Sequence, residues 1–339
     1  MPLVLAAPDK FRGTASAPDV AAAIGRAGRH AGWTVDEAPM SDGGEGLLDA
    51  AGGQARSTEV QGPLGQRVNA DWRMLDTPGG GTTAVIEMAR AAGRELLTHP
   101  KGEEPVRADT TGVGQLINAA LSAGVTRIVV GCGGSATTDG GWGAVQAIGS
   151  PDALRGVDVT IACDVTTPFR DAAAVFGPQK GATPQQVELL RQRLADLAEQ
   201  YKRTFGVDVD AIAGAGAAGG LAGGLAALGA KVVPGFDLVA GLVGLRDRLG
   251  AADLVVTGEG HLDPPSFAGK VPGGVLDLAR GHCPVLCVVG GADEELLSSP
   301  PDGMEIVSLV ERFGQRRARE ETVGLLEAVV AEALPRFCP

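Results

Sequence analysis

Five glycine-rich loops are the first feature of this sequence that could carry chemistry. They are SDGGEG from Ser41, GCGGSATTDGG from Gly131, FGPQKGA from Phe176, AGAGAAGG from Ala213 and TGEGHLDPPS from Thr257. Four of them combine glycine, whose backbone N–H groups are open to a ligand, with a carboxylate, a hydroxyl or a lysine. Backbone N–H groups and helix N-termini attract anions, and carboxylates bind Mg²⁺. We therefore expect a phosphate or nucleotide site.

Charged side chains next to apolar runs add candidates, each with a structural alternative. Lys10 and Arg12 follow a short apolar run and could bind an anion, but they also suit a solvated turn. Lys180 lies among turn residues and could reach a phosphate, or point into solvent. Asp164 ends an apolar strand, a common place for a catalytic carboxylate in an open α/β sheet.

The remaining carboxylates are concentrated in the glycine loops. Asp42 and Glu45 could bind metal or substrate, and Asp139 could bind Mg²⁺, but all three could instead cap helices. Four polar residues crowd one loop beside a strand end, which indicates a site: Glu259, Asp263, Ser266 and Lys270.

The elements that must position these residues have the pattern of an α/β protein. Apolar strands and amphipathic helices alternate near both chain ends, which is typical of a parallel sheet. Three strands near 56–61, 66–75 and 82–88 follow one another without a helix, which predicts an antiparallel meander. We expect a doubly wound domain from residues 1–60 and 235–339, with a second α/β domain inserted at 61–234.

Composition excludes several classes of function. The chain has 339 residues and a net charge of −12, which argues against binding to nucleic acid or to anionic lipid. No apolar run is long enough to span a membrane, and the N-terminus does not resemble a signal peptide. Five scattered cysteines do not form a disulfide framework. We expect a cytoplasmic protein, and the sequence leaves its oligomeric state, including a homodimer, open.

Known nucleotide motifs match only in part. Gly131-x-Gly133-x-x-Ala136 and Gly214-x-Gly216-x-x-Gly219 fit the dinucleotide pattern, but TTDGG follows the first, and no clear strand precedes the second. A dinucleotide-dependent oxidoreductase is therefore a weak alternative. The Walker A, protein-kinase and serine-hydrolase motifs do not occur.

Ten collinear segments make the chain resemble the type I glycerate kinase family. They run from residue 7 to about residue 274 and are APDKFRGTASA, PMSDGGEG, GPLG, IEMARAAG, TTGVGQLI, GCGGSATTDGG, ACDVTTP, FGPQKGA, GAGAAGGLAGGL, and TGEGHLD with GKVPGGV. The resemblance implies a flavodoxin-like domain, an inserted domain and an active site in the cleft between them. It also implies Mg²⁺-dependent transfer of a phosphoryl group from ATP to D-glycerate. The usual product is 2-phosphoglycerate, and 3-phosphoglycerate is the alternative.

Some positions depart from the family pattern. Lys10-Phe11-Arg12 stands where Ser-Phe-Lys is common, Thr167 replaces an Asn, and Pro265 replaces a Gln. The segments 148–157 and 168–176 are shorter than usual. If the shortening removes part of a substrate lid, the chain could instead be a nucleotide-binding regulator without catalysis.

The roles that we expect for a glycerate kinase follow from the chemistry of each side chain. The acceptor is a small anion, so Lys10 or Arg12 is expected to bind its carboxylate. Phosphoryl transfer depends on positioning and charge neutralisation. We favour Asp164 as the base that takes the proton of the hydroxyl, with Asp263 second. The full expected set is catalytic Asp164, Asp263 and Lys180; substrate-binding Lys10, Arg12, Asp42, Glu45 and Ser266; phosphate-binding Gly133, Gly134, Ser135, Thr137, Gly258 and Lys270; and metal-binding Asp42, Asp139 and Glu259.

Overall fold

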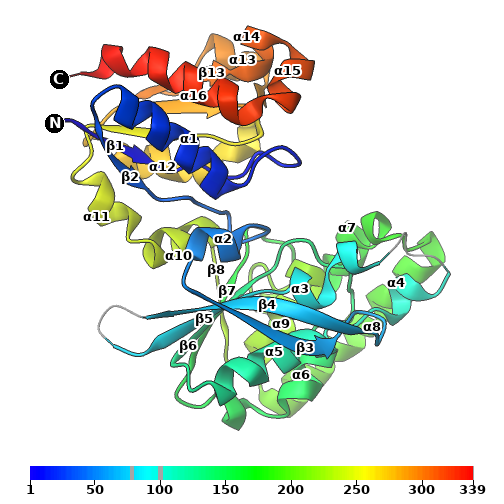
Figure 1. The fold of residues 1–339 in the computed structure, drawn as a ribbon. Coiled ribbons are helices and arrows are strands. Elements are labelled where there is room, and N and C mark those ends of the chain that lie inside the picture. The colour runs from blue at the N-terminus through cyan, green and yellow to red at the C-terminus, as the bar shows by residue number, and fades with distance from the viewer. Residues whose placement is uncertain (77–79, 98–101, 339) are drawn as a thin grey trace. The chain divides into compact units, whose positions relative to one another are not determined.

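The computed structural model describes residues 1–76, 80–97 and 102–338, which form two units. Unit 1 comprises residues 1–42, 49–51 and 235–339, and unit 2 comprises residues 43–48 and 52–234. The fold is the expected one, an α/β protein (Figure 1). A parallel sheet is built from both ends of the chain, and a mixed sheet is built from the middle part of the sequence. Unit 2 includes residues 43–48 and 52–60, which the sequence analysis placed in the first domain. Of these, the strand at 54–61 pairs within the mixed sheet.

Unit 1 contains a five-stranded parallel sheet in the order β13-β11-β9-β1-β2. Its strands are β1 (Leu3–Ala6), β2 (Thr34–Glu37), β9 (Leu254–Thr257), β11 (Val285–Val289) and β13 (Met304–Ser308). A separate parallel pair joins β10 (His261–Leu262) to β12 (Gly291–Ala292). The helices are α1 (Ala17–His30), α10 (Gly235–Leu242), α11 (Leu245–Leu249), α12 (Val271–Ala279), α13 (Glu294–Ser298), α14 (Leu309–Phe313), α15 (Gln315–Glu320) and α16 (Thr322–Ala333).

Helices cover both faces of this sheet because its strands are apolar on both sides. Val4, Val256 and Val288 belong to one buried cluster with residues of α1 and α16, which lie side by side (Figure 1). The alternate residues Leu5 and Val255 are also buried but are not part of that cluster. Successive side chains of a strand point to opposite faces. The second face is covered by α12, which packs against β9 and β11.

Unit 2 contains a six-stranded mixed sheet in the order β3-β4-β5-β6-β7-β8. Its strands are β3 (Gln54–Gln61), β4 (Arg67–Asp76), β5 (Thr82–Glu87), β6 (Arg127–Gly131), β7 (Asp158–Ala162) and β8 (Lys231–Val233). The meander β3-β4-β5 is antiparallel, as predicted, and β5 to β8 are parallel. The helices are α3 (Ala89–Ala92), α4 (Glu104–Arg107), α5 (Thr111–Ser122), α6 (Trp142–Ile148), α7 (Ala172–Phe176), α8 (Pro184–Phe205) and α9 (Ala217–Ala227). The short helix α2 (Leu47–Ala51) has residues in both units.

The start of α9 is not regular helix. Ala218, Gly219 and Gly220 have φ values of 54°, 69° and 95°, so regular helix follows only after them. The reason is close packing. A Cβ atom on Gly219 would lie 2.0 Å from the carbonyl oxygen of Thr137, so the backbone here lies against the loop 131–141.

Within the described residues, no helix is long and apolar enough to cross a membrane.

We expect Gly219→Ala to be about 1–3 kcal/mol less stable than Gly229→Ala, because a side chain at 219 collides with backbone. Gly229 is a matched control, since it also has a positive φ of 102°, but a Cβ atom on it would have no other atom within 4 Å. Urea unfolding of both variants measures the difference. Equal losses of stability would contradict the packing explanation.

Candidate functional site

The polar loops of unit 1 meet at the carboxyl ends of β1 and β9. In the strand order, β1 leads to β2 on one side, while β9, β11 and β13 follow on the other. The order in which successive strands are placed across the sheet therefore reverses between the parallel neighbours β1 and β9. Open α/β sheets bind ligands outside the strand ends at such a point. Asp9 and Lys10 follow β1 there, and Glu259 follows β9.

A pocket of about 680 Å³ lies at this position in unit 1. Its lining is highly charged. Six of the residues predicted from the sequence line it: Lys10, Arg12, Asp42, Glu259, Asp263 and Lys270. The structure therefore brings together residues from three separate parts of the sequence, with acids and bases intermixed.

Asp9 also lines this pocket, and sequence analysis missed it. Its carboxylate accepts a hydrogen bond from the backbone N–H of Lys10 at 2.6 Å and from Lys10 Nζ at 3.4 Å. Burial raises the pKa of Asp9 to about 6, against the opposing charge of Lys10. The signal that could have found it is its place directly after a strand, which is the argument that selected Asp164.

Lys10 is held between two carboxylates. Its Nζ lies 3.4 Å from Asp9 Oδ1 and 3.8 Å from Asp42 Oδ1. Although burial opposes the charge, these two carboxylates raise the pKa of Lys10. Lys10 is thus a fixed cation in the pocket, whereas Arg12 is exposed at its edge.

Glu259 is a buried acid of the pocket. The residue is 8% exposed, and its Oε1 atom has no hydrogen-bond partner among the described residues. Burial raises the pKa of Glu259 to about 7, while Ser266 and Lys270 act in the opposite direction. A buried carboxylate oxygen without a donor is costly, unless a ligand supplies one.

Asp263 and Ser266 are engaged with each other. Ser266 Oγ and the Ser266 N–H both donate to Asp263 Oδ1, at 2.8 and 3.0 Å, and together the two residues cap the 3₁₀ turn Pro264–Phe267. Lys270 Nζ lies 3.6 Å from the same oxygen. Burial opposes ionisation of Asp263, but the hydrogen bonds of Ser266 and the charge of Lys270 lower its pKa overall. Ser266 is fully buried, so its substrate contact stays a prediction.

Gly258 is a packing residue in this structure. It is buried, its carbonyl accepts the N–H of Asp9 at 2.8 Å, and a Cβ atom would lie 1.9 Å from the carbonyl oxygen of Val288. The glycine therefore permits the close approach of β9 and β11. Its predicted contact with phosphate is not tested.

The second group of predicted residues lies in unit 2, on the loop between β6 and α6. Gly133 and Ser135 are half-buried and Gly134 is exposed, so this part of the backbone reaches solvent. The loop at 43–45 packs directly on it: a Cβ atom on Gly133 would lie 2.7 Å from Gly44 Cα and 3.0 Å from the nitrogen of Glu45. The structure thus brings two glycine loops together, and Glu45 is exposed beside them.

Lys180 is buried under this loop and hydrogen-bonds to its backbone. The residue is 4% exposed, and Nζ donates to the carbonyl oxygen of Thr137 at 2.5 Å. Burial lowers the pKa of Lys180 to about 7, partly offset by the charge of Asp139. Thr137 is itself fully buried. In this structure both residues fix the loop, and a direct contact of either with phosphate stays a prediction.

Asp139 holds the other end of the loop. Its carboxylate accepts four hydrogen bonds: from Thr110 N at 2.9 Å, Thr110 Oγ1 at 2.7 Å, Gly141 N at 3.2 Å and Gly143 N at 3.1 Å. Burial nevertheless raises its pKa. These bonds cap α6 and join it to the residue before α5. Every donor is a protein group, so the side chain has the structural role that sequence analysis kept as the alternative to Mg²⁺ binding.

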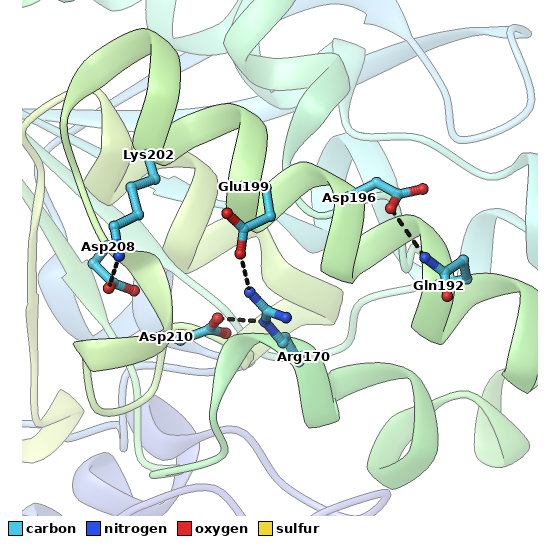
Figure 2. A network of polar contacts seen from close by, with 7 residues as sticks. All are labelled: Arg170, Gln192, Asp196, Glu199, Lys202, Asp208 and Asp210. Atoms are coloured by element: carbon cyan, nitrogen blue, oxygen red, sulfur yellow. Dashed lines mark hydrogen bonds and ion pairs between the residues drawn. The ribbon is translucent and has the colours of Figure 1, made fainter.

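Asp164 follows β7 at the same edge of the mixed sheet, and its side chain is exposed. Its charge and that of Lys180 both act on the thiol of Cys132, whose pKa is raised mainly by burial. The segment after Asp164 is anchored by Arg170, which pairs with Glu199 of α8 at 2.7 Å and with Asp210 (Figure 2). The position fits the prediction of a strand-end carboxylate, but its role as the base is not tested.

Comparison with known proteins identifies the relatives of this chain. The model of the glycerate kinase family matches residues 4–152 and 149–336. Glycerate 2-kinase of Escherichia coli and glycerate kinase of Bacillus subtilis are each 37% identical, over 86% of this chain and 86% of the relative. The crystal structure of a proposed glycerate kinase 2 from Salmonella typhimurium LT2 is 35% identical and has a TM-score of 0.81, with 99% of both chains covered.

We expect Asp139→Asn to lower stability by about 2–4 kcal/mol, because an amide NH₂ would face the N–H donors that the carboxylate accepts. Asp152→Asn is the control, since Asp152 is exposed on a surface turn and should change stability by less than about 0.5 kcal/mol. Urea unfolding with and without Mg²⁺ measures both. A loss that appears only with Mg²⁺ would restore Asp139 as a metal ligand.

The raised pKa of Glu259 predicts a pH-dependent stability. Its folded-state pKa of about 7 exceeds the ordinary value of 4.5, so the folded state binds more protons between these values. The stability of the native protein relative to Glu259→Gln should therefore fall by about 3 kcal/mol as the pH rises from 4.5 to 7, and be constant above. Urea unfolding across this range measures the difference, and a flat difference would show that the carboxylate is not desolvated.

Proposed function

Because the chain belongs to the glycerate kinase family, we propose that it transfers the γ-phosphoryl group of ATP to the 2-hydroxyl of D-glycerate, forming 2-phosphoglycerate and ADP. Relatives at 37% identity carry the names glycerate 2-kinase and glycerate kinase, and these names support the reaction. The name of the Escherichia coli relative supports the 2-position over the 3-position.

The observation that carries the proposal is the charged pocket of unit 1. D-Glycerate is a small carboxylate with two hydroxyls, so its site needs a cation and acceptors for hydroxyl hydrogens. The pocket offers Lys10 and Arg12 for the carboxylate, and the acids Asp42 and Glu259 for the hydroxyls. Since Lys10 is already fixed by Asp9, it loses little conformational freedom when it binds an anion.

We propose that the phosphates of ATP bind the loop 131–141 of unit 2. Gly133, Gly134 and Ser135 present backbone to solvent, and the carboxylate of Asp139 and the ammonium of Lys180 hold the loop in place. Phosphoryl transfer depends on groups that are in position before charge develops. Because buried hydrogen bonds of Asp139 and Lys180 already hold the loop, its backbone is in position before the phosphates bind.

Mg²⁺ belongs to the proposal, since phosphoryl transfer from ATP uses it to neutralise phosphate charge. Among the residues that the structure describes, no cluster of three or more His, Cys, Asp or Glu could hold a metal by itself. Mg²⁺ is often held by one or two carboxylates together with substrate phosphates. Asp42 fits such a role because it lines the pocket with 27% of its side chain exposed. Asp139 does not fit, because its carboxylate already accepts four protein donors.

The proposed partners are the small molecules ATP and D-glycerate. A cytoplasmic location stays a prediction from the sequence, and whether the chain forms a homodimer is left open. An oxidoreductase and a non-catalytic regulator are the alternatives, and the assay below distinguishes all three.

We expect the purified protein to release ADP when given Mg-ATP and D-glycerate, and the product to be converted directly by enolase to phosphoenolpyruvate. ADP with enolase coupling only after a phosphoglycerate mutase is added would mean that the 3-hydroxyl is the acceptor. Absence of ADP release would reject the kinase, and binding of ATP and glycerate without turnover would then favour the regulator. Reduction of NAD would favour the oxidoreductase.

A further inference from the structure

Glu259 is a pocket residue whose buried Oε1 atom lacks a hydrogen-bond donor among the described residues. It lies two residues beyond the end of β9, at the point where the strand order reverses. Its backbone carbonyl accepts the N–H of Gly290 at 3.0 Å, which ties the main chain to the end of β11. The side chain is therefore carried by a fixed backbone.

The Oε1 atom of Glu259 is buried and accepts no hydrogen bond from any described residue. Asp9, Asp263 and Lys270 are the charged groups whose electrostatic effect reaches it, and Cys287 of β11 is also close enough to interact. A hydroxyl of a bound ligand would supply the missing donor and remove the cost of burial.

Three other candidate acids fit this task less well. Asp263 Oδ1 already accepts two hydrogen bonds from Ser266, and Asp9 Oδ1 accepts two from Lys10. Asp164, which we favoured from the sequence, is exposed to water in unit 2. Among the described residues that line the pocket, only Glu259 has a fully buried side-chain oxygen without a hydrogen-bond partner.

We propose that Glu259 is the catalytic base: its Oε1 atom accepts the hydrogen bond of the acceptor hydroxyl of glycerate and takes its proton. This rests on the proposed function. The hydroxyl oxygen forms a new bond to the γ-phosphorus of ATP as the bond from that phosphorus to the β–γ bridging oxygen breaks. The proton moves to Glu259, and ADP leaves with the electron pair of the broken bond.

The test compares Glu259→Gln with Glu259→Ala. The Gln variant keeps an oxygen that can accept a hydrogen bond but cannot take a proton. It should lose about 10²–10⁴-fold in kcat, with KM for D-glycerate within about threefold of the native value. The Ala variant lacks both functions, so it should lose kcat and also raise KM. Glu332→Gln, an exposed residue of α16, is the control that should keep native activity.

Each of the following outcomes would overturn the proposal that Glu259 is the base. If Glu259→Gln retains kcat within threefold while Asp164→Asn loses it, Asp164 is the base. If higher Mg²⁺ concentration restores the Gln variant, Glu259 is a metal ligand, as the sequence had suggested. If only KM rises, Glu259 merely positions the substrate. The native protein is assayed in parallel: its failure to phosphorylate D-glycerate would reject the proposed function itself, whereas native turnover with an unaffected Gln variant rejects this inference alone.

Discussion

The pairing of β1 with β9 is the constraint on which the rest of the structure depends. The first strand of the chain accepts as its neighbour a strand that starts about 250 residues later, with Val4 opposite Leu254. This pairing creates the reversal of strand order in unit 1 and brings the Asp9-Lys10 turn beside the Glu259 turn. Without it, the acids and the lysine of the pocket would belong to separate surfaces. The pocket is therefore a consequence of topology, and its residues need no proximity in the sequence.

The two glycine-rich regions use charge in opposite ways. In unit 1, charged side chains line an open pocket, where Lys10 is held by two carboxylates and Glu259 has an oxygen without a donor. In unit 2, the side chains of Asp139 and Lys180 are buried beneath the loop, and the backbone of Gly133 and Gly134 reaches solvent. Small substrates need specific side chains, whereas phosphates can be bound by main chain, so this division suits a kinase.

Long elements and strand-end residues could be predicted from the sequence, whereas the direction of individual side chains could not. The parallel sheet, the meander and six pocket residues follow from apolar periodicity and from the rule that sites lie at strand ends. For Lys180 and Asp139 both a ligand contact and a structural role were open, because a sequence does not show whether a polar side chain points out of a loop or under it. Asp9 lies directly after a strand, as Asp164 does, but the sequence does not distinguish a carboxylate that lines a pocket there from one that only ends the strand. The two-residue strands β10 and β12 are too short for any periodicity.

The distance along the chain between β1 and β9 also determines an order of assembly during synthesis. Residues 52–234 of unit 2 form a continuous segment with its own sheet and core, so they can fold as soon as they leave the ribosome. Unit 1 cannot complete its sheet until β9, β11 and β13 have been made, so β1 and α1 must wait with apolar surface exposed. Translation proceeds at about 5–20 residues per second, which makes this delay at least about 10 seconds. During this delay, the apolar faces of β1 and α1 are open to contact with chaperones.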